Sequence, residues 1–274
     1  MRVVALTDRD QIREFLLTDR FFADYALGDL DPAHFPFTEW FGAEEHGDLC
    51  AVVMLYNDLQ PPILFATGEA RGIELIIDQV VRLPRLSLSI REEHLPIIEK
   101  YYRADLVPML KMALEGQPSM RARSAKQSIT AQDEIASSSF GLLAMTRLDV
   151  SHMPLLKELY SYGGGDAFRQ RSLELGVFYG GFDEAKLISV AGTHIVSDNE
   201  HIAALGNVMT HPAYRGRGLA TAATRAVCEE LLGRGIELIG LSVSRSNAAA
   251  IRVYEKIGFK RRVLFYEGMA TRIR

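Results

Sequence analysis

Arginine and glycine alternate over Arg215, Gly216, Arg217 and Gly218, between a strand-like run at 203–209 and a helix-like run at 220–232. A strand, a tight glycine turn and a helix together present free backbone N–H groups and the positive end of a helix to an anion. The glycines permit the backbone angles and the close approach that a pyrophosphate requires, and the arginines add positive charge. We therefore expect a diphosphate-binding loop formed by Arg215, Gly216, Arg217, Gly218, Leu219, Ala220 and Thr221.

The loop differs from two common nucleotide-binding patterns. It lacks the lysine of the G-x-x-x-x-G-K-[ST] loop, and it is not a G-x-G-x-x-G turn followed by an acidic residue about 20 positions later. It reads instead as R-x-x-G-x-A, filled by Arg215, Gly218 and Ala220. This pattern resembles the acyl-CoA pyrophosphate loop of the GNAT superfamily of N-acyltransferases.

A second motif lies at 241–259. An alternating strand pattern at 241–244 precedes a helix-like segment at 248–257, with Ser246 or Asn247 as its N-cap and Gly258 as its stop. The run N-A-A-A-I-R-V-Y-E-K-I-G-F, which begins at Asn247, resembles the GNAT helix that forms the second half of the acyl-CoA site. The resemblance covers roughly residues 140–274.

The resemblance implies acetyl-CoA as co-substrate and gives roles to several residues. Tyr254 would protonate the departing CoA thiolate, and Asn247 would bond the pantetheine or phosphate arm. The backbone of Val208 and Met209, in a strand bulge, would hold the thioester carbonyl, although both side chains equally fit a core strand. We expect Gly206 to supply the conformational freedom that a bulge needs.

No spacing rule identifies the base that removes a proton from the attacking amine. His194 lies in an alternating strand pattern expected to neighbour the cofactor strand, and Glu174 precedes another strand and could face the acceptor. A histidine in a strand is often only structural, and water could relay the proton. The candidate catalytic residues are therefore Tyr254, His194 and Glu174, with water as a further route.

The composition narrows the class of protein. Of the 274 residues, 31 are basic and 35 acidic, and the net charge of −4 gives no basic stripe for nucleic acid. The cysteines, Cys50 and Cys228, lie far apart and favour a reducing compartment over a disulfide framework. No metal-ligand spacing, signal-peptide pattern or membrane-length apolar run is found. We expect a cytoplasmic protein with no metal and no nucleic-acid or membrane partner; a homodimer is compatible with the sequence.

The chain is expected to form two domains of a mixed α/β (α+β-like) fold. A polar, small-residue stretch at 124–139 indicates a boundary between a domain at 1–138 and a domain at 139–274. A parallel strand pair should flank the glycine loop. In the second domain we expect strands at 142–149, 177–181, 186–196, 202–209, 236–243 and 262–270, and helices at 153–162, 166–175, 219–233 and 247–257.

The N-terminal half repeats the order strand, glycine turn, helix, strand, helix, with strands at 51–56, 63–67 and 86–90 and helices at 73–81 and 92–102. In this alignment Glu69 replaces a loop arginine, Arg91 replaces Asn247 and Ile98 replaces Tyr254. We hypothesise that residues 1–138 are a degenerate GNAT-like copy without a cofactor site. A tandem chain of this kind also resembles the glycine N-acyltransferase-like branch, which implies a small amine or amino acid as acceptor.

The favoured function is transfer of an acetyl group from acetyl-CoA to a primary amine of a small molecule by direct attack, with Tyr254 as general acid. Two alternatives stay open: a non-catalytic acyl-CoA-binding or regulatory module, and an acyltransferase that acts on an amino acid or a protein amine. Tyr254 argues against the binding module, because a protein that only binds needs no positioned acid.

Overall fold

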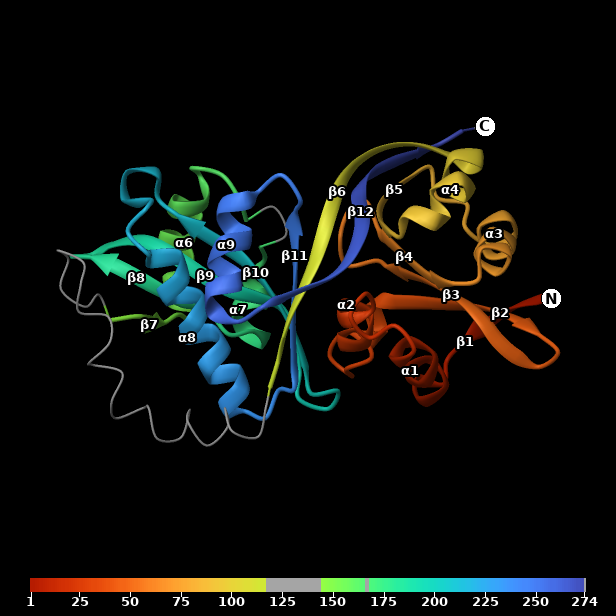
Figure 1. The fold of residues 1–274 in the computed structure, drawn as a ribbon, viewed down its shortest axis with the longest axis horizontal. Helices are drawn as coiled ribbons and strands as arrows, with labels where there is room; N and C mark the ends of the chain where they lie inside the picture. Colours follow the sequence, from red (N-terminus) through yellow and green to blue (C-terminus); the bar gives the residue numbers. More distant parts are fainter. Residues whose placement is uncertain (117–143, 166–167, 274) are drawn as a thin grey trace. The chain divides into compact units, whose positions relative to one another are not determined.

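The computed structural model describes residues 1–116, 144–165 and 168–273, which divide into two compact units (Figure 1). The first unit comprises Met1–Lys111, Val243–Asn247 and Arg261–Arg274, and the second comprises Met112–Ser242 and Ala248–Lys260. The expected domain boundary near residue 139 lies outside the described residues. No helix in the described part of the chain is long and apolar enough to cross a membrane.

The first unit is a sheet with helices on both faces. Within it, neighbouring strands follow the order β1-β2-β3-β4-β5-β12, with β6 beside β12. Its elements are β1 (Arg2–Leu6), α1 (Arg9–Leu17), α2 (Asp24–Gly28), η1 (Phe35–Phe37), β2 (Thr38–Glu45), β3 (Asp48–Tyr56), β4 (Ile63–Gly68), α3 (Ala70–Gln79), β5 (Arg85–Ile90), η2 (Glu92–His94), α4 (Leu95–Tyr101), most of β6 (Tyr102–Glu115) and most of β12 (Lys260–Arg272).

Burial on both sheet faces explains the apolar strands of this unit. Val53 and Leu55 of β3 pack in one core with Ile73 and Ile76 of α3. On the opposite face of the sheet, the ring of Phe65 lies 5.0 Å from that of Phe22 in the segment before α2. A strand that is covered on both faces loses the apolar–polar alternation, so β3 and β4 are continuous hydrophobic runs.

The second unit carries the glycine loop. Its strands follow the order β11-β10-β9-β8-β7, with the end of β6 beside β11. Its elements are β7 (Thr146–Arg147), η3 (Val150–His152), α6 (Met153–Tyr160), α7 (Gln170–Leu175), β8 (Tyr179–Asp183), β9 (Lys186–Ser197), β10 (Ile202–Thr210), η4 (Pro212–Tyr214), α8 (Leu219–Gly233), most of β11 (Leu238–Ser244) and α9 (Ala248–Ile257).

Helix α8 occupies the residues that the sequence predicts. Its buried stripe follows a four-residue spacing over Leu219, Ala223, Val227 and Leu231, which places these side chains on one helix face. The helix packs on β8, β9 and β10, and α9 packs beside it (Figure 1). Strand β10 runs parallel to β11 and antiparallel to β9, as the expected parallel pair around the loop requires.

The same order of elements occurs twice. Strands β2, β3 and β4, then α3, β5, α4 and β6, follow one another in the first half, as β8, β9, β10, α8, β11, α9 and β12 do in the second. The final strands are exchanged, however. In the first unit β5 pairs antiparallel with β12, from Ile90↔Tyr266 to Arg85↔Thr271, rather than with the strand that follows α4. Nothing in the sequence pattern indicates this exchange.

Candidate functional site

The glycine loop has the conformation that the sequence predicts. Gly216 and Gly218 adopt φ angles of 77° and 79°, in the left-handed region that is unfavourable for residues with a Cβ atom. No atom lies within 4 Å of a Cβ built on either glycine, and residues 215–218 are exposed. Gly218 is the N-cap of α8, so the N–H groups of Leu219, Ala220 and Thr221 have no acceptor within the helix. The loop therefore offers an open, N–H-rich surface to an anion.

Both loop arginines are anchored to the segment that leads into the loop. Arg215 Nε donates to the carbonyl oxygen of Thr210 at 3.3 Å, and an Arg217 guanidinium nitrogen donates to that of Ala213 at 3.2 Å. The Arg217 guanidinium also lies 5.0 Å from the ring centre of Tyr214. These contacts keep two positive charges beside the exposed glycines.

Strand β10 separates from β11 before it reaches the loop. The parallel pairing runs from Ile202↔Leu238 to Leu205↔Leu241, whereas β10 continues to Thr210. The pairing of β10 with β9 shifts between Gly206 and Met209, so an extra residue is inserted there. This is the bulge expected around Val208 and Met209.

The bulge differs from the expectation in which residue takes the unusual backbone angle. Asn207, not Gly206, adopts the left-handed conformation, with φ 54°. Gly206 is required for space instead, because a Cβ at this position would lie 1.9 Å from His194 Nε2. His194 Nδ1 lies 3.4 Å from Asn207 Nδ2. The structure therefore places the His194 ring directly against the bulge.

Tyr254 lies on α9 and is 8% exposed. Its ring centre is 5.9 Å from that of Phe259. Burial, with a smaller effect of Cys228, raises the pKa of Tyr254 to about 12. The hydroxyl therefore stays protonated at neutral and moderately alkaline pH, as a proton donor must.

The other two candidates lie in different surroundings. Glu174 is exposed on α7, where its carboxylate accepts a hydrogen bond from Gln170 Nε2 of the same helix at 2.9 Å. Asn247 directly precedes α9, and its N–H donates to the carbonyl oxygen of Ser244 at 2.9 Å. Asn247 belongs to the first unit and the glycine loop to the second, so the expected contact of Asn247 with CoA stays a prediction.

Sequence reasoning did not single out Tyr160, which ends helix α6. Its hydroxyl donates a hydrogen bond to the carbonyl oxygen of Asn207, at 2.8 Å, and so reaches the bulge. The contact joins residues 47 positions apart. No motif spacing links them, so only the fold reveals the pair.

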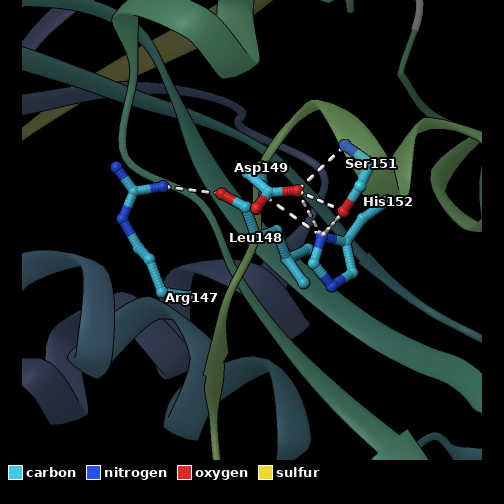
Figure 2. Close-up of polar contacts among 5 residues, drawn as sticks. All are labelled: Arg147, Leu148, Asp149, Ser151 and His152. Carbon is cyan, nitrogen blue, oxygen red and sulfur yellow. Dashed lines mark hydrogen bonds and ion pairs between the residues drawn. The ribbon is translucent and has the colours of Figure 1, made fainter.

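A serine, a histidine and an aspartate meet at the start of α6, as Figure 2 shows. Asp149 Oδ1 lies 2.9 Å from His152 Nδ1, and Ser151 Oγ lies 3.3 Å from the same nitrogen. A nucleophilic triad needs the serine and the carboxylate on different ring nitrogens. Asp149 also accepts the N–H of Ser151 at 2.9 Å, so this cluster is a helix cap.

The corresponding place in the first unit, the junction of β4 and α3, has neither the strand bulge nor the glycine loop. Strand β4 pairs with β3 from Tyr56↔Ile63 to Ala51↔Gly68 without a register shift, so it carries no bulge. Only Glu69 separates β4 from α3, and Gly68 O is 3.0 Å from His94 Nε2. The position aligned with Tyr254 is the buried Ile98.

A family of known proteins matches the part of the chain that contains the bulge, the glycine loop and α9. Residues 146–259 match the model of the acetyltransferase (GNAT) family. Among the described residues, no group of His, Cys, Asp or Glu side chains could hold a metal ion.

Two curated relatives each match little more than a quarter of the chain. The [ribosomal protein bS18]-alanine N-acetyltransferase of Escherichia coli strain K12 is 39% identical over 74 residues, which are 27% of this chain and 48% of that enzyme. The mycothiol acetyltransferase of Streptosporangium roseum is 39% identical over 80 residues, 28% of this chain and 24% of that enzyme. This chain thus spans about half or less of these relatives.

A solved structure resembles almost the whole chain. It is a tandem GNAT protein from the clavulanic acid biosynthesis pathway, with a TM-score of 0.59, 13% identity and 98% of each chain covered. At this identity the likeness shows the fold alone. It confirms the expected mixed α/β, GNAT-like fold and agrees with a tandem arrangement of two such domains.

Proposed function

We propose, from the premise that the C-terminal half of this chain is a GNAT acetyltransferase domain, that the protein transfers an acetyl group from acetyl-CoA to a primary amine of a small molecule. The observation that carries the proposal is the bulged strand β10, which leads through the short helix η4 into the left-handed glycines before α8. Amides of Gly216 to Thr221 would bind the pyrophosphate, together with Arg215 and Arg217. The amides of Val208 and Met209 would hold the thioester carbonyl.

The proposed reaction is direct attack of the amine nitrogen on the thioester carbonyl carbon. The new C–N bond forms as the C–S bond breaks, Tyr254 gives its proton to the sulfur, and His194 accepts a proton from the amine. Two observations favour His194 over Glu174 as the base. The His194 ring packs on Gly206 at the bulge, while Glu174 is exposed and bonded to Gln170.

The two halves of the chain would then differ in role. We propose residues 139–274 as the catalytic domain and residues 1–138 as a degenerate GNAT-like domain. The unshifted β4 pairing and the short turn at Glu69 support this assignment, since a thioester carbonyl would find no bulge there and a pyrophosphate no glycine loop. Asn247 is proposed to bond the arm of CoA.

Thiol release from acetyl-CoA tests the function with a panel of acceptors. We expect turnover with small primary amines. Turnover only with peptides that present an alanine amine would assign a protein acceptor, as for the ribosomal protein acetyltransferase of Escherichia coli. Acetyl-CoA binding without turnover on any acceptor would identify a non-catalytic module.

Substitution of Gly218 by valine should weaken acetyl-CoA binding. A β-branched residue at φ 79° is strained, so the free loop should relax out of this conformation. Restoring it on binding costs roughly 1–2 kcal/mol, which corresponds to about tenfold in Kd. Calorimetric titration measures the change. Gly47→Val is the matched control, because Gly47 has φ 100° and open space but lies in the β2–β3 turn of the first unit. An equal loss of affinity in both variants would contradict the role of the loop.

The pH profile of turnover should show no loss from Tyr254 up to pH 10.5. A general acid acts in its protonated form, and burial raises the pKa of Tyr254 to about 12. A tyrosine with the ordinary pKa of about 10 would lose roughly three quarters of its protonated form by that pH. The measurement is kcat between pH 7 and 10.5 at saturating substrates. A fourfold decline that is absent from Tyr254→Phe would show that the tyrosine titrates normally.

A further inference from the structure

The bulge in β10 holds a residue in an unfavourable conformation. Gly206 pairs with Gly192 and Met209 with Val190, so Asn207 and Val208 together lie opposite one residue of β9. Asn207 adopts φ 54°. A non-glycine residue keeps this backbone angle only where surrounding contacts hold it.

Two hydrogen bonds supply such contacts. The Tyr160 hydroxyl donates to the carbonyl oxygen of Asn207 at 2.8 Å, and Asn207 Nδ2 donates to the carbonyl oxygen of Thr193 at 3.4 Å. The first is the shorter bond and acts on the main chain itself. It therefore fixes the orientation of the peptide between Asn207 and Val208.

The Tyr160 ring is itself held in place. It packs in the core with Leu156 and Met209, and its centre lies 5.1 Å from that of Phe168. A Cβ on Gly165 would lie 2.6 Å from Tyr160 Cγ, so only glycine lets the chain close over this ring. Burial raises the pKa of the Tyr160 hydroxyl, which keeps it protonated and able to donate.

The geometry of the peptide bond links this contact to the chemistry. The carbonyl of Asn207 and the N–H of Val208 belong to one planar trans peptide unit, in which they point in opposite directions. A side chain that fixes the carbonyl oxygen at one end also fixes where the N–H points at the other. The N–H of Val208 is one of the two amides proposed to hold the thioester carbonyl.

We propose that Tyr160 is a positioning residue that aims the Val208 N–H at the thioester carbonyl oxygen. This inference rests on the proposed function. Tyr160 need not touch the substrate, because it acts through the peptide that it anchors. Its hydroxyl therefore sets the alignment of the oxyanion-stabilising donor.

Tyr160→Phe tests the proposal, since it removes one oxygen atom and keeps the packed ring. We expect kcat to fall about 10- to 100-fold, less than the 10²–10³-fold loss when an oxyanion donor is removed outright. The KM for acetyl-CoA should change little, because the pyrophosphate loop is untouched. Tyr102→Phe is the matched control: Tyr102 is also buried and donates to a main-chain carbonyl, that of Leu83 at 3.1 Å, in the first unit.

A second readout needs no acceptor amine and is specific to the carbonyl. The wild-type protein should bind acetyl-CoA more tightly than S-ethyl-CoA, which lacks the carbonyl oxygen. Tyr160→Phe should narrow this ratio, whereas a general loss of structure would weaken both ligands equally. Gly165→Ala, which displaces the same ring by its Cβ, should narrow the ratio as well. Thermal unfolding checks that each variant is folded.

The outcomes separate this inference from the proposed function. If wild-type protein binds and turns over acetyl-CoA, and Tyr160→Phe keeps both kcat and the ligand ratio, the positioning role is overturned alone. A folded Tyr160→Phe that loses affinity for both ligands equally overturns it too. If wild-type protein binds no acetyl-CoA, the proposed function fails and this inference fails with it.

Discussion

Replacement of Tyr254 by phenylalanine should lower kcat by about 10²- to 10⁴-fold, the usual contribution of a general acid. The reason is that the CoA thiolate would leave without a proton donor beside it. Acetyl-CoA should still bind, because the ring that packs near Phe259 is retained and only the hydroxyl is lost. Thiol release at saturating amine gives kcat, and calorimetry gives the Kd.

Tyr214→Phe is a suitable control for Tyr254→Phe. Tyr214 lies in η4 just before the loop, and its hydroxyl donates to Asp183 at 2.6 Å. It should leave kcat within a few-fold of wild type. A Tyr254→Phe variant with near wild-type kcat would contradict the general-acid role and show that Tyr254 is only a core aromatic residue.

Gly206→Ala should cause the second large loss. The new Cβ would meet His194 Nε2 at 1.9 Å, so either the ring or the bulge must move. Overpacking of this kind costs about 1–3 kcal/mol of stability, and a displaced base lowers turnover by about 10²-fold or more. Thermal unfolding and kcat measure the two effects separately.

Four variants interpret the Gly206→Ala result. In Gly180→Ala the new Cβ meets Leu187 Cδ1 at 2.5 Å, Leu148 Cδ1 at 3.0 Å and the main-chain oxygen of Ser189 at 3.2 Å, so this variant controls for crowding in the same unit. His194→Gln should lower kcat about as much as Gly206→Ala does. The double variant should lose little more than either single variant, since both changes act through the His194 ring. Glu174→Gln should retain activity. A larger loss in Glu174→Gln than in His194→Gln would contradict the assigned base.

The parts of the site set by local chain geometry follow from the sequence. Helix α8 spans the expected 219–233, because a left-handed glycine starts it and its apolar stripe is continuous. Alternating runs likewise placed β9 and β10 within a residue of their ends. The bulge was expected near Val208 and Met209, and the register shift occurs there.

Features set by distant contacts could not be read in this way. Strands β1 and β2 were not predicted, and the unusual backbone angle of the bulge was expected at Gly206, whereas Asn207 adopts it. Glycine is needed at 206 because the His194 ring occupies the space that a side chain there would fill, a contact that the local pattern does not reveal. Tyr160 and the exchange of β12 also depend on pairings across long stretches of chain, which periodicity does not encode.

A crystal structure of the protein with bound acetyl-CoA would locate the pyrophosphate. We expect its oxygens within hydrogen-bond distance of main-chain N–H groups between Gly216 and Thr221. Acetyl-CoA bound to the first unit, or a pyrophosphate that makes no contact with these amides, would contradict this expectation.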